Sequence, residues 1–584
     1  MHMRGFDYLS DKRTQSGGMT RLATLMRDLR ETSEANGDVV VAVDNGDSLQ
    51  GTPLEELALR QRGEPHVFYR ALSVMKYDAA GLGNHDFNFG LDHLAASVRA
   101  AHVPVLCSNA RRIDGSDLPV ESWTILRRHM QGVPLNIGVF SLLPPQTLVW
   151  DADHLAGHLI VDDIVTSART AIAELQTAGC DIIICLAHTG LGEPEAMFGQ
   201  ENAVWPLSNL EGVDAIVAGH THLLLPDPDA PDHSDMSRGI LNGTPVVMPG
   251  TGGDHLGVID LELSHSAAGW QVVSATSQLR AVSGPEDIDL TKMTAPLHKA
   301  TQDLLARRAG LSPVHLHSYF SFLVPSPALA LVAAAKAHAL RAHTSGDFDL
   351  PLLSCAAPTK MGGRGGPQCY LDIPGGPLSL RHVYDLCFFP NRLAAVVVTG
   401  AELVDWIEMS AGIYNRVEAH QPDQILFDPR RPAHSSDVVY GVQYELDLSQ
   451  PSRFDEQGQL MDPRAHRVKT LKHRGRKVKP GDRFIVALSS YRANGGGNVH
   501  ALKTAERLDI PSVLIRDALR DYLSEGLFPD GAYESSFHFS SLNETWVTAQ
   551  TGPGARRFLD EIDCMRAEDC GLDQQGFLSL RLCL

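Results

Sequence analysis

The sequence predicts two α/β domains in series, joined by a helix. Short apolar runs alternate with helical stretches of ten or more residues in the first half of the chain. A charged helical stretch (288–309) lies near the middle, and new strands and helices follow it. Buried strands separated by helices are typical of layered α/β domains. A chain of 584 residues is also too long for one hydrophobic core.

The strands expected in the first domain are short apolar runs that end in polar residues. These runs are 39–43, 79–82, 135–142, 181–187, 213–219 and 244–250. A helix is expected from Pro53 to Arg62, because proline is favoured in the first turn of a helix. Ligands of α/β sheets bind beyond the carboxyl ends of the strands. The polar residues that follow the runs are therefore the candidate site.

The second domain has elements of its own. The runs 393–400 (LAAVVVTG) and 482–490 (DRFIVALSS) predict strands, and 328–343 (ALALVAAAKAHALRAH) predicts a helix. The segment 410–470 is rich in Pro, Asp and Arg and is expected to form long surface loops. The predicted boundaries are a first domain at 1–285, a linker helix at 286–310, a second domain at 311–550 and a C-terminal tail at 551–584.

Composition restricts the partners. The formal net charge of −20 argues against a nucleic-acid duplex, which needs a basic stripe to displace counterions. An acidic protein can still bind a small anion when metal ions supply positive charge locally. No apolar run approaches the ~20 residues of a membrane helix, so no membrane partner is expected. A monomer is expected as a separate matter. Nine cysteines without a CxxC pair disfavour a zinc ribbon, and Cys564 and Cys570 remain open as a pair.

Four polar clusters follow strands of the first domain. They are DNGD (44–47), GNHD (83–86), LAHTG (186–190) and GHTH (219–222). One histidine after a strand is usually a packing or capping residue, but four such clusters in one domain indicate a shared site. Imidazole, carboxylate and amide oxygen together suit Zn, Mn or Co. Two such ions sharing a carboxylate, ~3.5–4 Å apart, would polarise a phosphoryl oxygen.

These clusters resemble the calcineurin-like metallophosphoesterase pattern. More closely, DNGDSLQGTPLEELALRQRG, GLGNHDFNFGLDHL, ICLAHTGLGEP and LNGTPVVMPGTGGDHLGVIDLEL resemble the bacterial 2′,3′-cyclic-nucleotide 2′-phosphodiesterase/3′-nucleotidase branch of the 5′-nucleotidase family. The likeness continues through LLSCAAPTKMGGR, DLCFFPNRL, YGVQYELDLSQPSRFD and SSYRANGGG. It implies a four-layer metallophosphoesterase β-sandwich flanked by helices, then the linker helix and a second α/β nucleotidase C-terminal domain.

The resemblance implies a metal-ligand set. In this family pattern Asp47 bridges both ions. Asn84, His188 and His220 are the other ligands of the second ion, and His222 is a ligand of the first.

The resemblance also implies catalytic groups beside the ligands. His85 matches the histidine that stabilises the transferring phosphoryl group or protonates the leaving oxygen. Asp86 is a second catalytic candidate; the alternative is a carboxylate that orients His85 or caps the following turn. Relatives specific for 5′-nucleotides carry an acid where Asn88 stands, so Asn88 favours the cyclic-nucleotide branch.

In the second domain the resemblance implies a substrate clamp. Tyr491 and Phe389 would stack on the two faces of the nucleobase, a contact worth ~1–3 kcal/mol for any base. Phe388 competes with Phe389 for this role, since alternation of side chains suggests that one of the two faces the core. Arg364 and Asn391 are candidates for contacts with ribose or phosphate.

The expected function is hydrolysis of 2′,3′-cyclic nucleotides and 3′-nucleotides to nucleoside and phosphate, with two divalent ions (Zn, Mn or Co). A 5′-nucleotidase, a thiosulfate-processing hydrolase and a nucleotide-binding protein without activity remain as alternatives. The aromatic pair favours a substrate that carries a nucleoside.

The family's first strand ends in Asp-x-His, which here would fall just before Met1. We therefore expect the natural chain to begin upstream, with this strand and a signal peptide that directs it to the periplasm. The alternative is a short cytoplasmic chain of weak or no activity, since residues 1–18 contain no apolar signal region.

Overall fold

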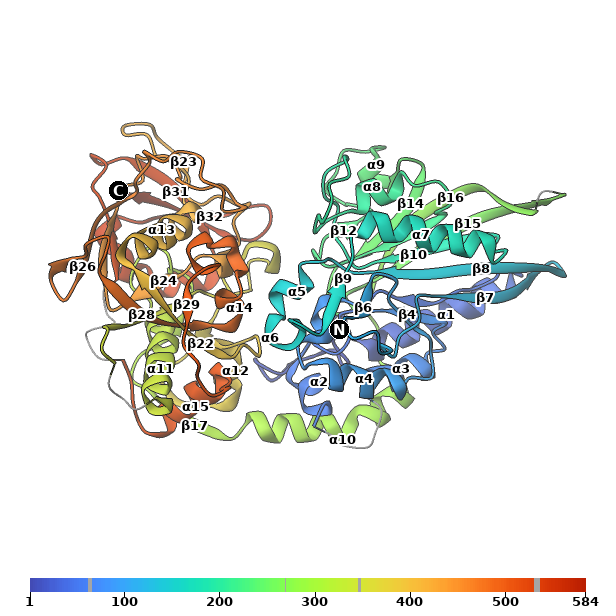
Figure 1. Cartoon of the computed structure of the whole chain (residues 1–584), viewed down its shortest axis with the longest axis horizontal. Helices are drawn as coiled ribbons and strands as arrows, with labels where there is room; N and C mark the ends of the chain where they lie inside the picture. The colour runs from blue at the N-terminus through green and yellow to red at the C-terminus, as the bar shows by residue number, and fades with distance from the viewer. Residues whose placement is uncertain (61–65, 268, 345–347, 530–535) are drawn as a thin grey trace. The chain divides into compact units, whose positions relative to one another are not determined.

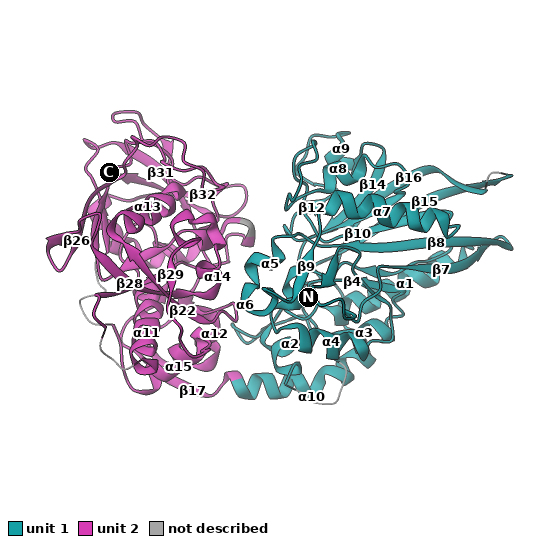
Figure 2. Ribbon diagram, in the orientation of Figure 1, with its two compact units in different colours: residues 1–304 teal, residues 305–584 magenta. Residues whose placement is uncertain are grey.

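The structure is a computed structural model that describes residues 1–60, 66–267, 269–344, 348–529 and 536–584. The chain divides into two compact units, unit 1 at Met1–Leu304 and unit 2 at Leu305–Leu584 (Figures 1 and 2). Helix α10 (Ile288–Leu305) occupies the charged stretch from which a linker helix was expected.

Unit 1 is built on two sheets of mainly parallel strands. The larger has the strand order β12–β14–β11–β10–β8–β7, with β13 beside β14, and the smaller has the order β3–β4–β5. Within them, β8, β10, β11 and β14 run parallel, as do β3, β4 and β5. A long antiparallel ribbon, β15–β16, accompanies them.

The strands of unit 1 are β1 (Phe6–Asp7), β2 (Lys12–Arg13), β3 (Val43–Asp44), β4 (Ala79–Gly81), β5 (Val105–Leu106), β6 (Ala110–Arg112), β7 (Trp123–Met130), β8 (Val133–Leu142), β9 (Leu159–Val161), β10 (Ile182–Ala187), β11 (Ala215–Ala218), β12 (Leu224–Leu225), β13 (Ile240–Leu241), β14 (Thr244–Pro249), β15 (His255–Ser266) and β16 (Gly269–Ala281). Its helices before α10 are α1 (Met19–Ala35), α2 (Pro53–Ala58), α3 (Val67–Val74), η1 (Asn84–Phe87), α4 (Leu91–Arg99), α5 (Thr147–Trp150), α6 (Ala152–Leu155), α7 (Ile164–Thr177), α8 (Val204–Ser208) and α9 (Asp235–Arg238).

The two sheets of unit 1 stack face to face and are covered by helices. Ile137 and Val139 of β8 and Ile182 of β10 belong to the core between the sheets. On the other face, Phe140 of β8 and Ile183 of β10 pack in the cluster that includes the buried residues of α7. Because side chains alternate along a strand, one strand serves both cores. Figure 1 shows α7 on one side of this stack and α3 and α4 on the other, which confirms the four-layer arrangement.

Most predicted strands of unit 1 are present, but the run 39–43 is not a regular strand. Only Val43 and Asp44 pair in the ladder, opposite Ala79 and Ala80. The amide of Ala42 donates instead to the Asp78 side chain at 2.9 Å. The Asp78 amide donates to the Ala42 carbonyl at 2.7 Å, so both the backbone and the side chain of Asp78 bind Ala42 where the ladder ends. Apolar spacing cannot reveal this end of the strand.

The helix expected at 53–62 begins where proline predicted, and α2 ends at Ala58. The Thr52 side chain accepts from the Leu54 amide, and the Glu55 side chain accepts from the Thr52 amide, which forms a capping box. Residues 61 and 62 of the expected helix lie outside the described residues.

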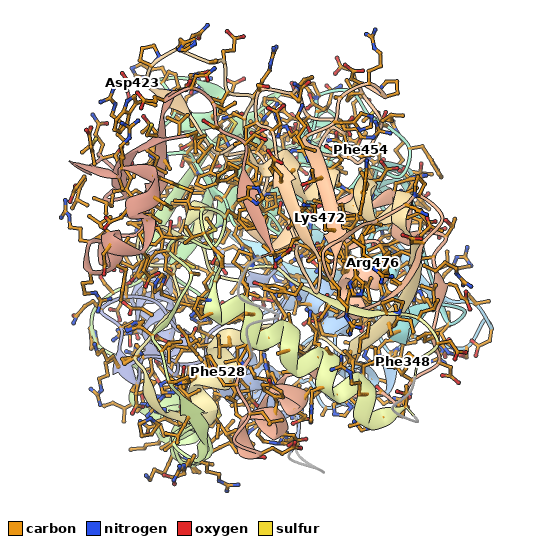
Figure 3. All side chains as sticks on the ribbon, turned by 90° about the vertical axis from the view of Figure 1, so that its left-hand side faces the viewer. Phe348, Asp423, Phe454, Lys472, Arg476 and Phe528 are labelled. Carbon is orange, nitrogen blue, oxygen red and sulfur yellow. The ribbon has the colours of Figure 1, made fainter. Side chains whose placement is uncertain are left out.

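In its described residues, unit 2 contains three larger sheets and two two-stranded sheets, β17–β21 and β18–β20. The orders of the larger sheets are β24–β19–β28–β22–β29, β23–β31–β33–β32 and β27–β26–β25–β30. The strands are β17 (Arg308–Ser312), β18 (Leu316–His317), β19 (Leu352–Ala356), β20 (Asp372–Ile373), β21 (Gly376–Ser379), β22 (Leu393–Thr399), β23 (Gln424–Ile425), β24 (Val438–Tyr440), β25 (Gln443–Leu446), β26 (Val468–His473), β27 (Arg476–Lys477), β28 (Arg483–Ser489), β29 (Glu506–Arg507), β30 (Phe537–Phe539), β31 (Trp546–Thr551), β32 (Glu568–Leu572) and β33 (Leu578–Cys583). Figure 3 shows the β26–β27 hairpin, marked by Lys472 and Arg476.

The helices of unit 2 surround these sheets. They are α11 (Pro327–His343), η2 (Gly363–Gly365), α12 (Leu380–Leu386), α13 (Gly400–Ser410), η3 (Ala411–Ile413), η4 (Ala433–Ser435), α14 (Ser490–Ala493), η5 (Gly496–Asn498), η6 (His500–Leu502), α15 (Ile515–Ser524) and η8 (Pro553–Met565). The predicted helix 328–343 and the strands at 393–400 and 482–490 therefore correspond to α11, β22 and β28.

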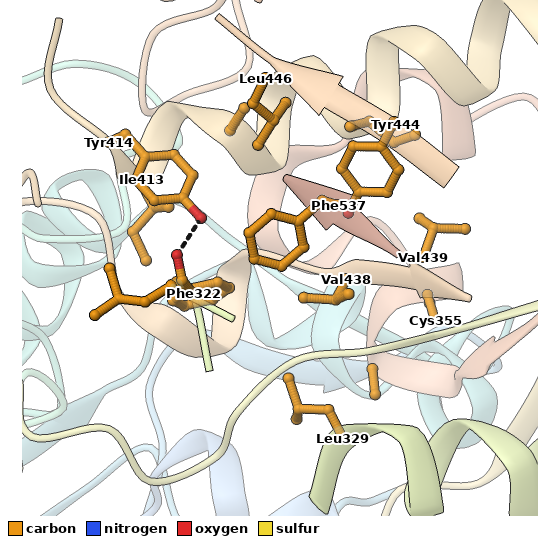
Figure 4. Packing of buried hydrophobic residues seen from close by; sticks show 14 of the residues in the cluster. Phe322, Leu329, Cys355, Ile413, Tyr414, Val438, Val439, Tyr444, Leu446 and Phe537 are labelled. Carbon is orange, nitrogen blue, oxygen red and sulfur yellow. Dashed lines mark hydrogen bonds between the residues drawn. The ribbon is translucent and has the colours of Figure 1, made fainter. Parts of the chain in front are cut away.

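Two expectations for unit 2 are wrong. The segment 410–470 is not only surface loop, because Val438–Tyr440 form a buried strand and Tyr444 and Leu446 of β25 also face the core (Figure 4). The segment 551–584 is not a tail. Its last strand, β33, lies between β31 and β32, and Leu578 and Leu580 are fully buried. The strand β24 pairs with the distant strand β19, whereas β33 pairs with β31 and with β32 directly before it. The alternation of apolar and polar residues in β33 is itself typical of a strand with one buried face.

Two further features concern the chain as a whole. Among the described residues, no helix combines the length and apolarity that a membrane span requires. All nine cysteines lie in described residues and each is free, so Cys564 and Cys570 are not paired. Cys564 belongs to η8 and Cys570 to β32, and both are exposed.

Candidate metal centre

The expected metal ligands of unit 1 follow the carboxyl ends of parallel strands in both sheets. These residues are Asp47 after β3, Asn84 after β4, His188 after β10, and His220 and His222 after β11. Asn45 joins the two sheets at this edge: its Nδ2 donates to the Ala187 carbonyl at 3.2 Å, and its own carbonyl lies 2.7 Å from His188 Nδ1. Residues up to 175 positions apart in the sequence are thereby brought to one place.

The ligand set contains two close pairs of donor atoms. His188 Nε2 lies 3.1 Å from Asp47 Oδ2, and His220 Nδ1 lies 3.0 Å from Asn84 Oδ1. Ligand bonds of about 2.0–2.2 Å to a zinc-like ion place two ligands roughly 3–3.5 Å apart. Both pairs thus have the spacing of two ligands on one ion.

Buried polar atoms at the site also fit an ion. His188 Nε2 has no hydrogen-bond partner among the described residues, although it is buried and faces the Asp47 carboxylate. Burial lowers the pKa of His222 to about 4, helped by the neighbouring His85, His188 and His220, so its ring is neutral at pH 7 as a ligand must be. Burial opposes ionisation of Asp47, yet His188 and His85 hold its pKa below the usual range.

The donor atoms of the candidate ligands lie close together in pairs and do not form one tight cluster. In the described part of the chain, no three His, Cys, Asp or Glu side chains are grouped closely enough to hold an ion by themselves. The amide oxygen of Asn84 is needed to complete the set. Carboxylate, imidazole and amide oxygen are nevertheless the donor types that divalent first-row ions accept.

The backbone at the site is strained in the way that functional loops often are. Asp47, His220 and His222 have φ values of 56°, 66° and 59°, a region that residues other than glycine rarely adopt. Gly83 is required for close approach of the loops. A Cβ atom there would lie 2.3 Å from Asp47 Oδ1 and 2.6 Å from His188 Cε1.

Asp86 has a structural role at the site, because its side chain accepts from the Gly83 amide and caps the turn η1, as one alternative expected. Its role as a catalytic residue stays a prediction. Its Oδ1 accepts from the amides of Ser48 and Leu49 at 2.8 and 2.9 Å, and its Oδ2 accepts from those of Asp47 and Gly83 at 3.0 and 2.8 Å. The side chain is 1% exposed. Four backbone amides use its acceptor capacity, and Asp86 thereby holds the Asp47 loop against the Asn84 turn.

The backbone and the ring of His85 both make hydrogen-bond contacts. Its amide donates to Asp47 Oδ1 at 2.7 Å, and its Nδ1 lies 2.8 Å from Asn88 Oδ1. Asn88 Nδ2 in turn donates to Asp151 Oδ1 at 2.9 Å. Burial raises the pKa of Asp151 to about 6.

Three site residues escaped the sequence analysis. Glu201 Oε1 lies 2.9 Å from His220 Nε2, on the side of the ring opposite Asn84. The Trp150 ring stacks on the His220 ring at 5.2 Å between centroids. Asp151 follows Trp150 in the chain. Trp150 ends the short helix α5, Asp151 precedes α6, and Glu201 lies in an irregular segment. Only the polar residues Glu201 and Asn202 offered a signal in the sequence.

In unit 2, the two segments expected to form the substrate clamp lie at the same end of two adjacent strands of one sheet. β22 and β28 run antiparallel with Leu393 opposite Ser489, so the turn before β22 meets the loop after β28. The Ser490 amide donates to the Arg392 carbonyl at 2.8 Å. Tyr491 follows directly. Its ring lies against Gly496, where a Cβ atom would come within 2.4 Å of Cζ.

The turn before β22 carries Phe388, Phe389 and Asn391. The two phenylalanine rings meet edge to face at 5.2 Å, and both are half-buried, so the expected division into one core and one surface ring is not observed. The Arg516 guanidinium donates to the carbonyls of Cys387 and Phe388 and holds this turn. Arg364 belongs to η2, but its side chain lies outside what the structure describes.

Comparison with known proteins agrees with this architecture. Residues 1–224 match the calcineurin-like phosphoesterase family, and residues 325–504 match the 5′-nucleotidase C-terminal domain. A putative 5′-nucleotidase from Staphylococcus aureus, solved with α-ketoglutarate, has a TM-score of 0.72 over 92% of this chain and 97% of its own, at 21% identity. At that identity the likeness shows the fold alone. The chain is thus a metallophosphoesterase with a 5′-nucleotidase C-terminal domain.

Sequence relatives define the family more narrowly. The 2′,3′-cyclic-nucleotide 2′-phosphodiesterase/3′-nucleotidase of Salmonella typhimurium is 35% identical over 85% of this chain and 80% of its own length. The trifunctional nucleotide phosphoesterase protein YfkN of Bacillus subtilis is 31% identical over 96% of this chain, which spans 40% of that protein. The chain belongs to the 2′,3′-cyclic-nucleotide 2′-phosphodiesterase/3′-nucleotidase family.

Proposed function

We propose that this protein hydrolyses 2′,3′-cyclic nucleotides to 3′-nucleotides and these to nucleoside and phosphate. The observation that carries the proposal is the pairing of donor atoms at the strand ends, with His85 between Asp47 and Asn88. A phosphoryl group needs positive charge opposite its oxygens and a proton for the oxygen that leaves. The donor pairs that would hold the ions and the histidine that would give the proton both belong to unit 1. Family membership and the names of the relatives support a nucleotide as substrate.

The ligand set would hold the divalent ions that this class of enzyme uses. Asp47, Asn84, His188, His220 and His222 would bind them, and the ions would supply charge that draws electron density from phosphorus. Two ions, drawn from Zn, Mn or Co, are part of the proposal. Asp86 keeps the Asp47 loop and the Asn84 turn in register through its four amide contacts.

His85 carries the proton transfer in this proposal. As the oxygen of water bonds to phosphorus, the bond to the leaving ribose oxygen breaks and its electron pair passes to that oxygen. His85 Nε2 then gives this oxygen a proton. The attacking water releases a proton to solvent, and His85 regains a proton from solvent before the next turnover. In a 2′,3′-cyclic nucleotide the 2′ oxygen leaves first, which yields a 3′-nucleotide, and the same step at the 3′ oxygen yields phosphate.

Further points of the proposal concern the substrate and the setting of the protein. Tyr491 and Phe389 of unit 2 stack on the base, and Asn391 and Arg364 contact ribose or phosphate. The half-buried state of both aromatic side chains is consistent with a ring-binding role. We also propose that the protein acts in the periplasm, as a monomer.

The test is a metal-dependent assay with matched substrates. Protein treated with chelator and then supplied with Mn, Co or Zn is given 2′,3′-cyclic AMP, 3′-AMP and 5′-AMP. Turnover of the first two that depends on the metal supports the proposal, and exclusive turnover of 5′-AMP identifies a 5′-nucleotidase instead. His222→Ala should lose most activity, whereas His129→Ala, which removes an exposed histidine of β7, should not. Nucleotide binding without turnover by any metal form would overturn it.

A further inference from the structure

We propose that Asp151 is a positioning residue for His85 and acts through the side-chain amide of Asn88. The inference rests on the proposed function, because it explains how the proton-transferring histidine is held. Asp151 lies 63 residues after Asn88, at the junction of α5 and α6. Neither the motifs nor the family comparison assigns it a role.

The three side chains form a chain of hydrogen bonds. His85 Nδ1 lies 2.8 Å from Asn88 Oδ1, and Asn88 Nδ2 lies 2.9 Å from Asp151 Oδ1. Asp151 is 8% exposed, so its contact with Asn88 is shielded from water. Hydrogen bonds of a carboxylate are stronger than those between neutral groups, more so where water is excluded.

The chemistry of the groups sets the direction of each bond. An ionised carboxylate only accepts, so Asp151 must face the NH₂ of Asn88 and not its oxygen. The oxygen of Asn88 must then face His85, and because this oxygen only accepts, the proton lies on His85 Nδ1. Proton exchange with the substrate is thereby assigned to Nε2. The charge of Asp151 thus selects the histidine tautomer through a neutral amide.

A local structural role does not account for Asp151. It stands at the N-cap position of α6, where aspartate commonly accepts from the first amides of the helix. Here its side chain makes no capping hydrogen bond. Instead, Oδ1 accepts from Asn88, and Oδ2 is buried without a hydrogen-bond partner in the described residues.

The pair also explains why position 88 carries an amide. An aspartate there would place two carboxylates at the 2.9 Å separation that Asn88 and Asp151 now have. Like charges this close cannot both remain ionised. An ionised acidic residue can therefore stand at position 88 or at position 151 but not at both, and in this chain it stands at position 151.

The first experiment compares two leaving groups in the metal-loaded, full-length protein. Asp151→Asn keeps the shape but allows the Asn88 amide to turn and donate to His85. For 3′-AMP, kcat should fall by roughly 10–100-fold, with KM changed by less than about twofold, because general acid catalysis is lost. For 4-nitrophenyl phosphate, whose leaving group needs no proton, kcat should fall by less than about threefold. Asp153→Asn, an exposed carboxylate two residues on, should leave both values unchanged.

The second experiment exchanges the two side chains. Asn88→Asp alone should also lower kcat on 3′-AMP, because two acids then face each other. The double variant Asn88→Asp/Asp151→Asn restores one acid and one amide, with the acid now accepting directly from His85. Its kcat should return to within about fivefold of the parent, since coupled residues show non-additive effects. Absence of rescue, or equal losses on both substrates in Asp151→Asn, would overturn the proposal.

A spectroscopic readout separates this proposal from the proposed function. In Zn-loaded protein labelled with ¹⁵N-histidine, His85 is identified by comparison with His85→Gln. The parent should show the proton on Nδ1, and Asp151→Asn should shift it toward Nε2. An unchanged tautomer would overturn the role of Asp151 even if the enzyme is active. A shifted tautomer would support it even if no nucleotide is hydrolysed, in which case the proposed function alone has failed.

Discussion

The candidate centre of unit 1 and the candidate clamp of unit 2 are built on different principles. In unit 1, each functional side chain follows a parallel strand and is held by buried polar partners, as Asp47 is by His188 and Asp86 by four backbone amides. In unit 2, half-buried aromatic rings stand on two loops at one edge of a mainly antiparallel sheet. The first arrangement holds the donor atoms of the candidate site in fixed positions. The second presents aromatic faces on which a planar ring can stack.

This difference predicts how the two regions respond to substitution. Buried charges are mutually dependent, because removing one leaves its partner without compensation. Stacking contacts contribute in smaller and more separate amounts. Changes to the buried polar groups of unit 1 should therefore alter catalysis or the free energy of unfolding, and changes in unit 2 should weaken substrate binding by degrees. The following predictions test this contrast in order of expected size.

Removal of the Asp47 charge should have the largest effect. Asp47→Asn takes away the carboxylate that faces His188 and that would bind the ions, so kcat/KM for 3′-AMP should fall at least roughly 10³-fold. Metal content, measured by elemental analysis after gel filtration, should fall with it. A variant that retains full metal content and more than a tenth of the activity would show that Asp47 is not a shared ligand.

Asp86→Asn should act on stability rather than on the chemical step. The new NH₂ group faces two of the four backbone amides and leaves them without acceptors, at a cost of about 2–5 kcal/mol in the free energy of unfolding. Denaturant unfolding measures this loss, and Asp92→Asn on the exposed face of α4 is the matched control. If the variant kept its stability but lost kcat, Asp86 would act in the chemical step instead.

Asp44 should make stability depend on pH. Burial raises its pKa from 3.8 to about 6, so the folded state binds the proton more tightly than the unfolded state. Its contribution is complete below about pH 4 and is lost as the pH rises through 6, a change of up to about 3 kcal/mol. Relative to the parent, Asp44→Asn should therefore gain stability between pH 4.5 and pH 8, measured by urea unfolding at each pH. A difference that does not vary with pH would contradict the raised pKa.

Tyr491→Ala should have the smallest effect and should be confined to binding. Loss of one stacking face should raise KM for 3′-AMP by roughly 5–150-fold, the equivalent of ~1–3 kcal/mol, with kcat nearly constant. KM for 4-nitrophenyl phosphate, which has no base, should not change. Parallel measurement of Phe388→Ala and Phe389→Ala decides which ring forms the opposite face. A large loss of kcat in Tyr491→Ala would remove the contrast between the two units.

Local patterns predicted the strands that pass through a core. The runs that became β8, β10, β11 and β14 are short, apolar and bounded by polar residues, and period and length suffice to recognise them. The run 39–43 failed this test, because both the backbone and the side chain of Asp78 bind Ala42 where the ladder ends. The strand β24 was missed because it is only three residues long and its partner β19 lies far away in the sequence. The strand β33 was missed although it alternates apolar and polar residues and pairs with β32 directly before it.

The candidate site likewise has a part that the sequence predicts and a part that it does not. The motifs at 44–47, 83–86, 186–190 and 219–222 named the residues that the structure brings together, because each lies directly after a recognisable strand. The contacts around them were not predictable. Asp86 belongs to the same GNHD motif as His85, yet its hydrogen-bond partners are backbone amides.

By itself, the sequence determined which side chains stand at the ends of the buried strands and therefore which donor types the site contains. Only the tertiary structure decided their roles. It turned Asp86 toward backbone amides, placed Glu201 behind His220 and joined Asp151 to His85 through Asn88. The physical reason is that residue type and spacing are local properties, whereas the role of a polar group depends on the donors and acceptors that folding brings to it from elsewhere in the chain.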